Sequence, residues 1–222
     1  MDIVSTMRAT SGRSASWFEG WRLFFLLALA ESGACLWLLG AGGEPGISSV
    51  IRNSARFSEV LFAAAFAASP LVALARSPGT LWLRRNRRYT GVAFAWSHTI
   101  HLAAIASLVV SSEQFASELD PVTLLGGGTA YVFVYLMAFT SSDAAQRALG
   151  MRNWQRLHRV GSWILWVVFA ETLTSGVVFG AWSRLPGAIL LWAVFALRVA
   201  AWRRRRKSTQ SRGHQEGAIH AT

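Results

Sequence analysis

The sequence predicts an all-α membrane protein, a bundle of six transmembrane helices with both termini in the cytoplasm. Three observations lead to this prediction. Of the 222 residues, 53% are hydrophobic and only 15% are charged, whereas a soluble domain carries about 25% charged residues. The apolar residues gather into six runs, each close to the length of about 20 residues that a bilayer crossing needs. The net charge of +11 is concentrated between and after these runs.

Each apolar run predicts one spanning helix, because no segment alternates with the period of a β-strand. The first run has some likeness to a signal peptide, but apolar residues resume at once as CLWLLG, which favours a retained helix. Pro186 falls in the first turn of the last run, where a missing N–H costs little. The expected spans are Trp21–Gly40, Phe57–Ala75, Thr90–Val110, Val122–Thr140, Val160–Trp182 and Leu185–Trp202.

Arginines alternate between the connections and set the expected orientation. The stretches RSPGTLWLRRNRR and MRNWQRLHR are basic, as are the N-terminal tail and the segment RRRRK, while the connections between them carry one arginine or none. The positive-inside rule places the basic segments in the cytoplasm. Residues 1–20 are then a cytoplasmic tail, 21–202 the membrane domain, and 203–222 a basic, disordered cytoplasmic tail. We expect no soluble domain, and hence no flavin- or nicotinamide-binding domain.

Composition argues against several functions. The aromatic residues lie inside the apolar runs rather than among the arginines, so no nucleic-acid partner is expected. Cys35 is the only cysteine, which leaves neither an intrachain disulfide nor a thiolate metal cluster. The glycine run Gly126–Gly128 lacks the context of a phosphate-binding loop and is interpreted as a site of close helix packing. Most arginines are expected to set topology and to contact membrane lipid.

Ionisable residues inside the spans are the candidate functional residues, because polar groups are costly in a bilayer. Glu31 lies in the first span, His98 and His101 in the third, and Glu171 in the fifth, with His158 near the inner end of the fifth. His98 and His101 are three positions apart and share one helix face. From the helical rise, His101 and Glu171 both lie roughly 20 Å above the inner ends of their helices.

These residues leave three interpretations open. Inward-facing histidines suit haem iron. His101 and Glu171 could instead form a buried polar pair without a cofactor, or Glu31 and Glu171 could serve a proton or ion pathway. A straight helix turns about 220° between His158 and Glu171, so these two share a face only if the helix bends, for instance near Gly161–Ser162.

Two stretches carry a family resemblance: LRRNRRYTGVAFAWSHTIHL and MAFTSSDAAQRALGMRNWQRLHRVGSWILW. They are similar to the ferric reductase-like transmembrane family, and within it most closely to haem-binding membrane subunits of bacterial periplasmic methionine sulfoxide reductase systems. The matching features are Arg87–Arg88, Gly91, AFAW and His101 in one stretch, and the pattern AFTS…QR.LG…W..LH, ending at His158, in the other. SPLVALARSP resembles the end of the second helix, and the likeness covers about residues 55–180.

The resemblance implies a six-helix cytochrome b in the bacterial inner membrane that takes part in electron transport. Electrons would come from a cytoplasmic flavin reductase or from quinol, and would reach a periplasmic oxidoreductase that contains molybdenum. Haem b is the implied cofactor, with FMN or quinone as further candidates. The chain would be the membrane subunit of an oxidoreductase, without a catalytic domain of its own.

By position, His101 and His158 match two of the family's metal-binding haem histidines, while the third falls on Glu171. Three outcomes follow. His101 holds the haem with Glu171 or water opposite; His98, an added histidine, shifts the haem; or haem binding is lost and a haem-free scaffold or interaction protein remains. A small transporter that uses Glu31 and Glu171 is a weaker interpretation, because no inverted repeat is visible.

Arg85 and Arg88 have a possible cofactor role beside their topological one. A guanidinium fork suits both a haem propionate and a flavin phosphate. We therefore include both arginines among the candidate cofactor-binding residues.

Overall fold

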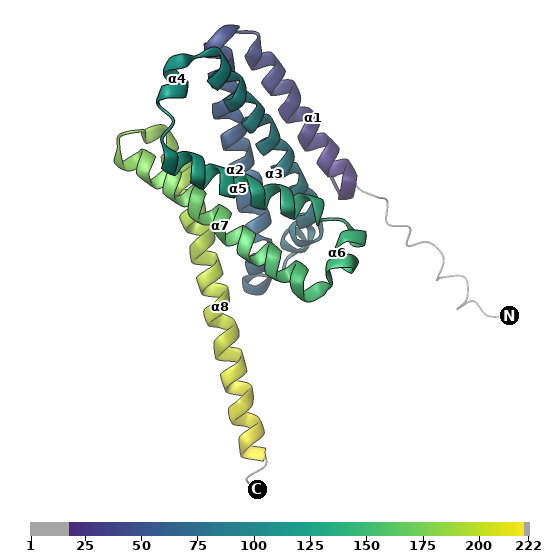
Figure 1. Ribbon diagram of the computed structural model, residues 1–222. Helices are drawn as coiled ribbons and strands as arrows, with labels where there is room; N and C mark the ends of the chain where they lie inside the picture. Colours follow the sequence, from purple (N-terminus) through teal and green to yellow (C-terminus); the bar gives the residue numbers. More distant parts are fainter. Residues whose placement is uncertain (1–17, 220–222) are drawn as a thin grey trace, which may run out of the picture.

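The computed structural model describes residues 18–219, with side chains described for 18–207. The described residues contain no strand, and six helices are long and apolar enough to cross a membrane (Figure 1). The chain is thus a multi-pass membrane protein, as predicted. The six helices are α1 (Gly20–Leu39), α2 (Gly43–Leu74), α3 (Pro78–Ser111), α5 (Pro121–Phe139), α7 (Met151–Val178) and α8 (Leu185–Ile219), and the short elements are α4 (Glu113–Ser117), α6 (Asp143–Leu149) and η2 (Trp182–Arg184).

Several helices extend beyond the predicted apolar spans. Helix α2 begins at Gly43 rather than at Phe57. Helix α3 begins at Pro78, because Ser77 and Thr80 form a capping box in which each side chain accepts a hydrogen bond from the backbone N–H of the other. Hydropathy alone does not detect these starts, since the added turns are polar.

The C-terminal segment differs from the prediction. Helix α8 continues to Ile219, so most of residues 203–222 is helical rather than disordered, and this part of α8 extends away from the bundle (Figure 1). Residues 1–17 and 220–222, which belong to the two predicted tails, lie outside the described residues.

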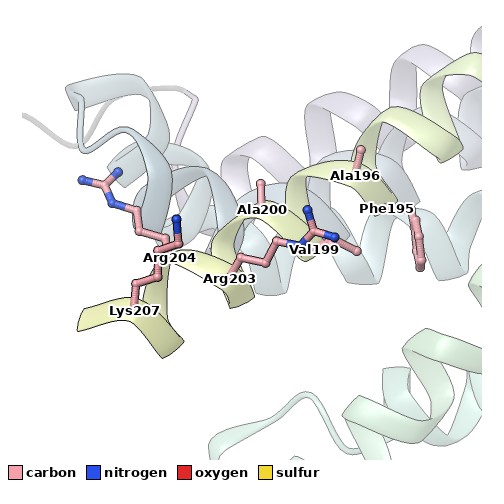
Figure 2. Close-up of a pocket in the computed structure, with 7 residues that line it drawn as sticks. All are labelled: Phe195, Ala196, Val199, Ala200, Arg203, Arg204 and Lys207. Atoms are coloured by element: carbon pink, nitrogen blue, oxygen red, sulfur yellow. The ribbon is translucent and has the colours of Figure 1, made fainter. Parts of the chain in front are cut away.

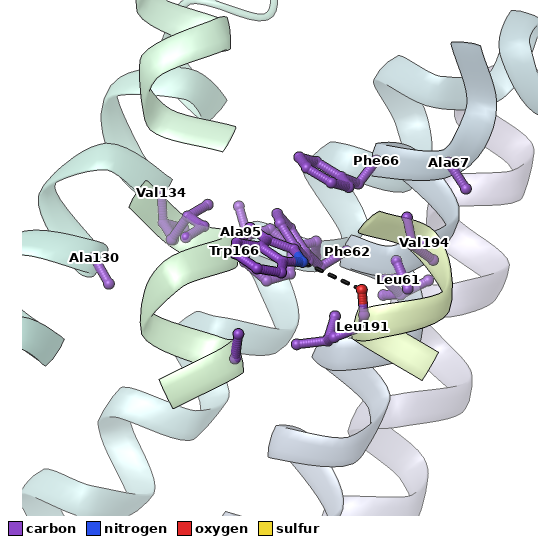
Figure 3. Close-up of a cluster of buried hydrophobic side chains, with 14 of the residues drawn as sticks. Leu61, Phe62, Phe66, Ala67, Ala95, Ala130, Val134, Trp166, Leu191 and Val194 are labelled. Carbon is purple, nitrogen blue, oxygen red and sulfur yellow. Dashed lines mark hydrogen bonds between the residues drawn. The ribbon is translucent and has the colours of Figure 1, made fainter. Parts of the chain in front are cut away.

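Helices α2 and α3 form the centre of the bundle. Helix α1 packs against both of them, α8 packs against α2 and α7, and α5 packs against α7 and α3. An aromatic core joins these layers, in which Phe62 lies with ring-centroid distances of 5.6 Å to Phe94 and 5.4 Å to Phe169. Figure 3 shows the buried cluster and the hydrogen bond of 3.2 Å from Trp166 Nε1 to the backbone carbonyl of Leu191, which ties α7 to α8.

A proline inside α2 explains an arginine inside α8. Pro70 has no N–H, so the carbonyl of Phe66, one helical turn earlier, lacks its usual partner. Arg198 donates from Nε and Nη2 to that carbonyl, at 3.3 Å each. Its guanidinium also lies 3.5 Å from the centroid of the Phe66 ring and 5.3 Å from that of Trp163. Arg198 therefore links α2, α7 and α8.

The glycine run in α5 does not support close packing. A Cβ atom added at Gly126, Gly127 or Gly128 would meet nothing within 4 Å. The prediction for this run was wrong, because no neighbouring helix comes close to any of the three glycines. Close packing occurs instead at Gly161 of α7, where a Cβ atom would lie 2.8 Å from Sδ of Met137.

Candidate functional site

His101 has one ring nitrogen fixed by helix α2. Its Nδ1 lies 3.1 Å from the backbone carbonyl of Ile51 and 3.1 Å from Oγ of Ser54. A carbonyl only accepts hydrogen bonds, so Nδ1 carries the proton. The neutral ring then has its lone pair on Nε2, the arrangement in which a histidine can bind a metal.

Ser54 supports this arrangement. Its side chain is fully buried, and its hydroxyl donates to the carbonyl of Val50 at 2.7 Å. With its only hydrogen directed there, Oγ is left to accept from Nδ1 of His101. Ser54 was missed in the sequence because it lies before the predicted second span, in a segment read as a connection.

Glu31 belongs to the same polar cluster. The residue is 2% exposed, and its Oε1 accepts a hydrogen bond of 2.5 Å from Oγ of Ser97. That hydroxyl also lies 3.1 Å from the carbonyl of Ser54. Oε2 of Glu31 is buried without a partner. The cluster thus connects α1, α2 and α3 around Glu31, Ser97, Ser54 and His101, and only its two ionisable members were predicted.

His98 lies next to His101 and packs against rings of α5 and α7. It is 8% exposed, and its ring centroid lies 5.6 Å from that of His101, 5.2 Å from Tyr131 and 5.5 Å from Phe169. Nδ1 of His98 and the hydroxyl of Tyr131 are both buried without a hydrogen-bond partner. Buried polar atoms are nearly always satisfied, so these two atoms, on rings whose centroids lie 5.2 Å apart, are candidates for contact with a bound group.

His158 lies near the start of α7, where its ring contacts the end of α5. Its Nε2 lies 3.1 Å from Oγ1 of Thr140, whose hydroxyl donates to the carbonyl of Leu136 at 2.6 Å. Nε2 therefore donates to Thr140, and the ring stacks near Trp154 with a centroid distance of 4.4 Å. Unlike His101, His158 has its Nε2 already engaged.

Glu171 lies apart from the histidines. Helix α7 runs without a break from Met151 to Val178, and at 3.6 residues per turn Glu171 lies about 220° around the helix from His158. The residue is exposed, and in the part of the chain with described side chains no hydrogen bond or ion pair joins it to His101. The interpretation of a buried His101–Glu171 pair is wrong, because Glu171 lies on an exposed face of α7 while the His101 ring is held against α2.

The arginines at the start of α3 separate by helix face. Arg85 pairs with Glu19 at 3.1 Å, and Arg88 pairs with Asp143 at 2.6 Å. Arg87, between them in sequence, instead reaches Oγ of Ser69 at 3.4 Å. It is near enough to act electrostatically on His158 and Arg198. No acidic side chain within 18–207 pairs with Arg87, which was not among the predicted site residues although it belongs to the matching motif.

Comparison with known proteins places the chain in a family. No family model matches the sequence, and no solved structure matches it. The chain is 30% identical over 189 residues to the protein-methionine-sulfoxide reductase heme-binding subunit MsrQ of Enterobacter sp. (strain 638), an alignment that covers 80% of this chain and 89% of the relative. The subunit of the same name from Azospira oryzae is 30% identical over 215 residues, which are 91% of this chain and 83% of the relative. With its six spanning helices and this similarity over most of both relatives, the chain belongs to the MsrQ family.

Proposed function

We propose that this chain is the haem-binding membrane subunit of a protein-methionine-sulfoxide reductase system. The observation that carries the proposal is the state of His101, whose Nδ1–H is held by Ile51 and whose Nε2 is left with its lone pair. Two relatives are named heme-binding subunits, which supports the same cofactor here. Haem b, when bound, would supply a one-electron carrier inside the membrane.

The residues of α2 and α3 fit a bound haem, whereas the position on α7 does not. His101 is the proposed axial ligand, and Ser54 and Ile51 fix its orientation. The neighbouring His98 and Tyr131, which contacts His98, each carry one unsatisfied buried polar atom. Glu171 stands where the family resemblance expects a histidine, but it lies on the exposed face of α7. Glu171 would therefore not hold the group together with His101.

The other end of the bundle supports a second, conditional role for His158. This histidine can present Nε2 to a metal only after it gives up the hydrogen bond to Thr140. A typical hydrogen bond contributes about 1 kcal/mol net, so giving it up is a small cost. Arg87, without an acidic partner, is better placed to meet a haem propionate or a flavin phosphate than Arg85 or Arg88, whose guanidiniums are paired with Glu19 and Asp143.

The proposed path runs across the bacterial inner membrane, with both termini and the basic connections in the cytoplasm. Electrons would arrive from a cytoplasmic flavin reductase or from quinol, with FMN or quinone as an auxiliary cofactor. They would leave to a periplasmic oxidoreductase. The alternating arginines support the orientation, and the names of the relatives support the link to methionine sulfoxide reduction.

A haem-free scaffold of the ferric reductase-like kind is the second candidate. The exposed Glu171 favours it, because the position has lost both the imidazole and an inward orientation. In that case the polar cluster around Glu31 and His101 would only join α1, α2 and α3.

Absorption spectra decide between the two. The full chain is purified in mild detergent, supplemented with haem and recorded in oxidised and dithionite-reduced states, beside His101→Ala. Ser107→Ala is the control, since Ser107 is exposed on the same helix and its hydroxyl bonds only to the carbonyl of Ala103. We expect a Soret band that shifts on reduction in the parent and the control and is lost in His101→Ala. A colourless parent, or a band that survives in His101→Ala, contradicts the proposal.

A further inference from the structure

One face of α8 forms a groove with two chemically different halves (Figure 2). The groove has a volume of about 670 Å³. Its apolar half includes Ala196, Val199 and Ala200, and its cationic half consists of Arg203, Arg204 and Lys207. These positions recur every three or four residues, so they follow one another along a single helix face.

The apolar half lies at membrane depth. Helix α8 crosses as part of the span Trp182–Lys207, and the groove occupies the C-terminal half of that span. The side chains of Ala196 and Ala200 are small, so an extended hydrocarbon chain can lie close to the helix backbone there.

The cationic half is held against α2, and no described acidic side chain pairs with it. Arg204 donates from Nη1 to the carbonyl of Leu74 at 2.6 Å, which anchors this end of α8 to the last turn of α2. Arg203 and Lys207 form neither an ion pair nor a hydrogen bond with any described side chain or backbone group. No described residue therefore neutralises these two cations at the edge of a hydrocarbon surface.

We infer that this groove binds one anionic phospholipid. The acyl chain lies along Ala196 and Ala200, and the phosphate meets Arg203 and Lys207. The charge complementarity selects an anionic head group over a zwitterionic one, because each cation at a membrane surface attracts anionic lipid by about 1 kcal/mol. A guanidinium fork matches phosphate oxygens. A free phosphate ion would satisfy the cations but would leave the apolar half uncovered.

Native mass spectrometry tests the inference. The full chain is released from detergent with defined amounts of phosphatidylglycerol or phosphatidylcholine, and the lipid-bound fraction is measured. We expect the parent to retain one phosphatidylglycerol in preference to phosphatidylcholine. Arg203→Gln with Lys207→Gln should weaken retention roughly tenfold or more, given the contribution of each cation. The matched control is Arg152→Gln with Arg156→Gln, which removes the same charge from exposed positions on α7 and should retain the lipid as the parent does.

Two tryptophan substitutions, one inside the groove and one outside it, test the apolar half. Ala200→Trp fills the groove and should prevent retention, whereas Ala106→Trp, at an exposed position of α3, should not. Inorganic phosphate and glycerophosphoglycerol, which carry the charge without an acyl chain, should not displace the lipid at equal concentration. The inference is overturned if both charge variants lose lipid equally, if Ala200→Trp retains it, or if either soluble anion displaces it. None of these readouts depends on haem.

Discussion

Arg198 of α8 donates two hydrogen bonds, each 3.3 Å long, to the backbone carbonyl of Phe66 in α2. The carbonyl is free because Pro70 cannot supply the N–H that would normally reach it. An arginine in a membrane span usually suggests an ion pathway. Here a local defect in a neighbouring helix accounts for it, and the guanidinium is further covered by the rings of Phe66 and Trp163.

This relationship predicts coupling between Arg198 and Pro70. Arg198→Ala should lower the free energy of unfolding by about 2 to 3 kcal/mol, since it removes charged hydrogen bonds and ring contacts. Pro70→Ala restores an N–H to the Phe66 carbonyl, so the loss from Arg198→Ala should be about 1 kcal/mol smaller in that background. Unfolding in detergent with added SDS measures both. Arg159→Ala, exposed on α7, is the control, and additive losses would contradict the assignment.

We expect Ser54 to affect haem affinity indirectly, through the hydrogen bond that it accepts from His101. Ser54→Ala removes one of the two acceptors for Nδ1–H of His101 and leaves Ile51. Loss of such a supporting hydrogen bond typically costs about 10- to 100-fold in metal affinity, and the lower end is expected because one acceptor remains. Haem titration followed at the Soret band measures it. Ser58→Ala, also fully buried on α2 but bonded to the carbonyl of Ala55, should bind haem as the parent does. Equal losses in the two variants would show a packing effect instead.

At position 31, we expect the shape of the side chain to matter more for stability than its charge. Glu31→Gln keeps an acceptor for Ser97 and removes the cost of a charge in a site where Oε2 has no partner, so stability should be unchanged or higher. Glu31→Ala deletes the acceptor and leaves a cavity, and should cost about 1 to 3 kcal/mol. Thermal unfolding followed by tryptophan fluorescence compares them. If Gln is as damaging as Ala, the stability depends on the carboxylate itself rather than on its shape, which contradicts the prediction.

At position 187, the packing of α2 against α8 leaves no room for a side chain larger than that of glycine. The carboxylate of the buried Glu59 lies directly over this glycine, at a distance too short for an added Cβ atom. Gly187→Ala should therefore displace the Glu59 carboxylate and destabilise the protein by about 1 kcal/mol, the low end for overpacking, because the atoms in the way are the end of a flexible side chain. Gly128→Ala is the matched control, because open space surrounds that glycine and alanine is the better helix former. The assignment fails if Gly187→Ala unfolds at the same temperature as the parent or above it, and combining it with Glu59→Ala should relieve the steric part of the loss.

The sequence by itself determined the number and approximate place of the six spans. Hydrophobicity is a local property, so a run such as Trp21–Gly40 predicts its own helix without knowledge of any neighbour, and α1 follows it closely. Ionisable residues in those runs stand out for the same reason. Glu31, His98 and His101 were identified in this way, and the structure buries the first two and fixes the third.

Only the tertiary structure decided which side chains of different helices form hydrogen bonds and ion pairs with one another. Ser54 and Ser97 are ordinary serines until α1, α2 and α3 pack together around Glu31 and His101. Adjacent arginines such as Arg87 and Arg88 point about 100° apart on a helix, and which of them meets an acid depends on where Asp143 of α6 lies. Hydrogen-bond partners between helices are set by interhelical packing, which joins residues far apart in the chain and is not encoded in any one segment.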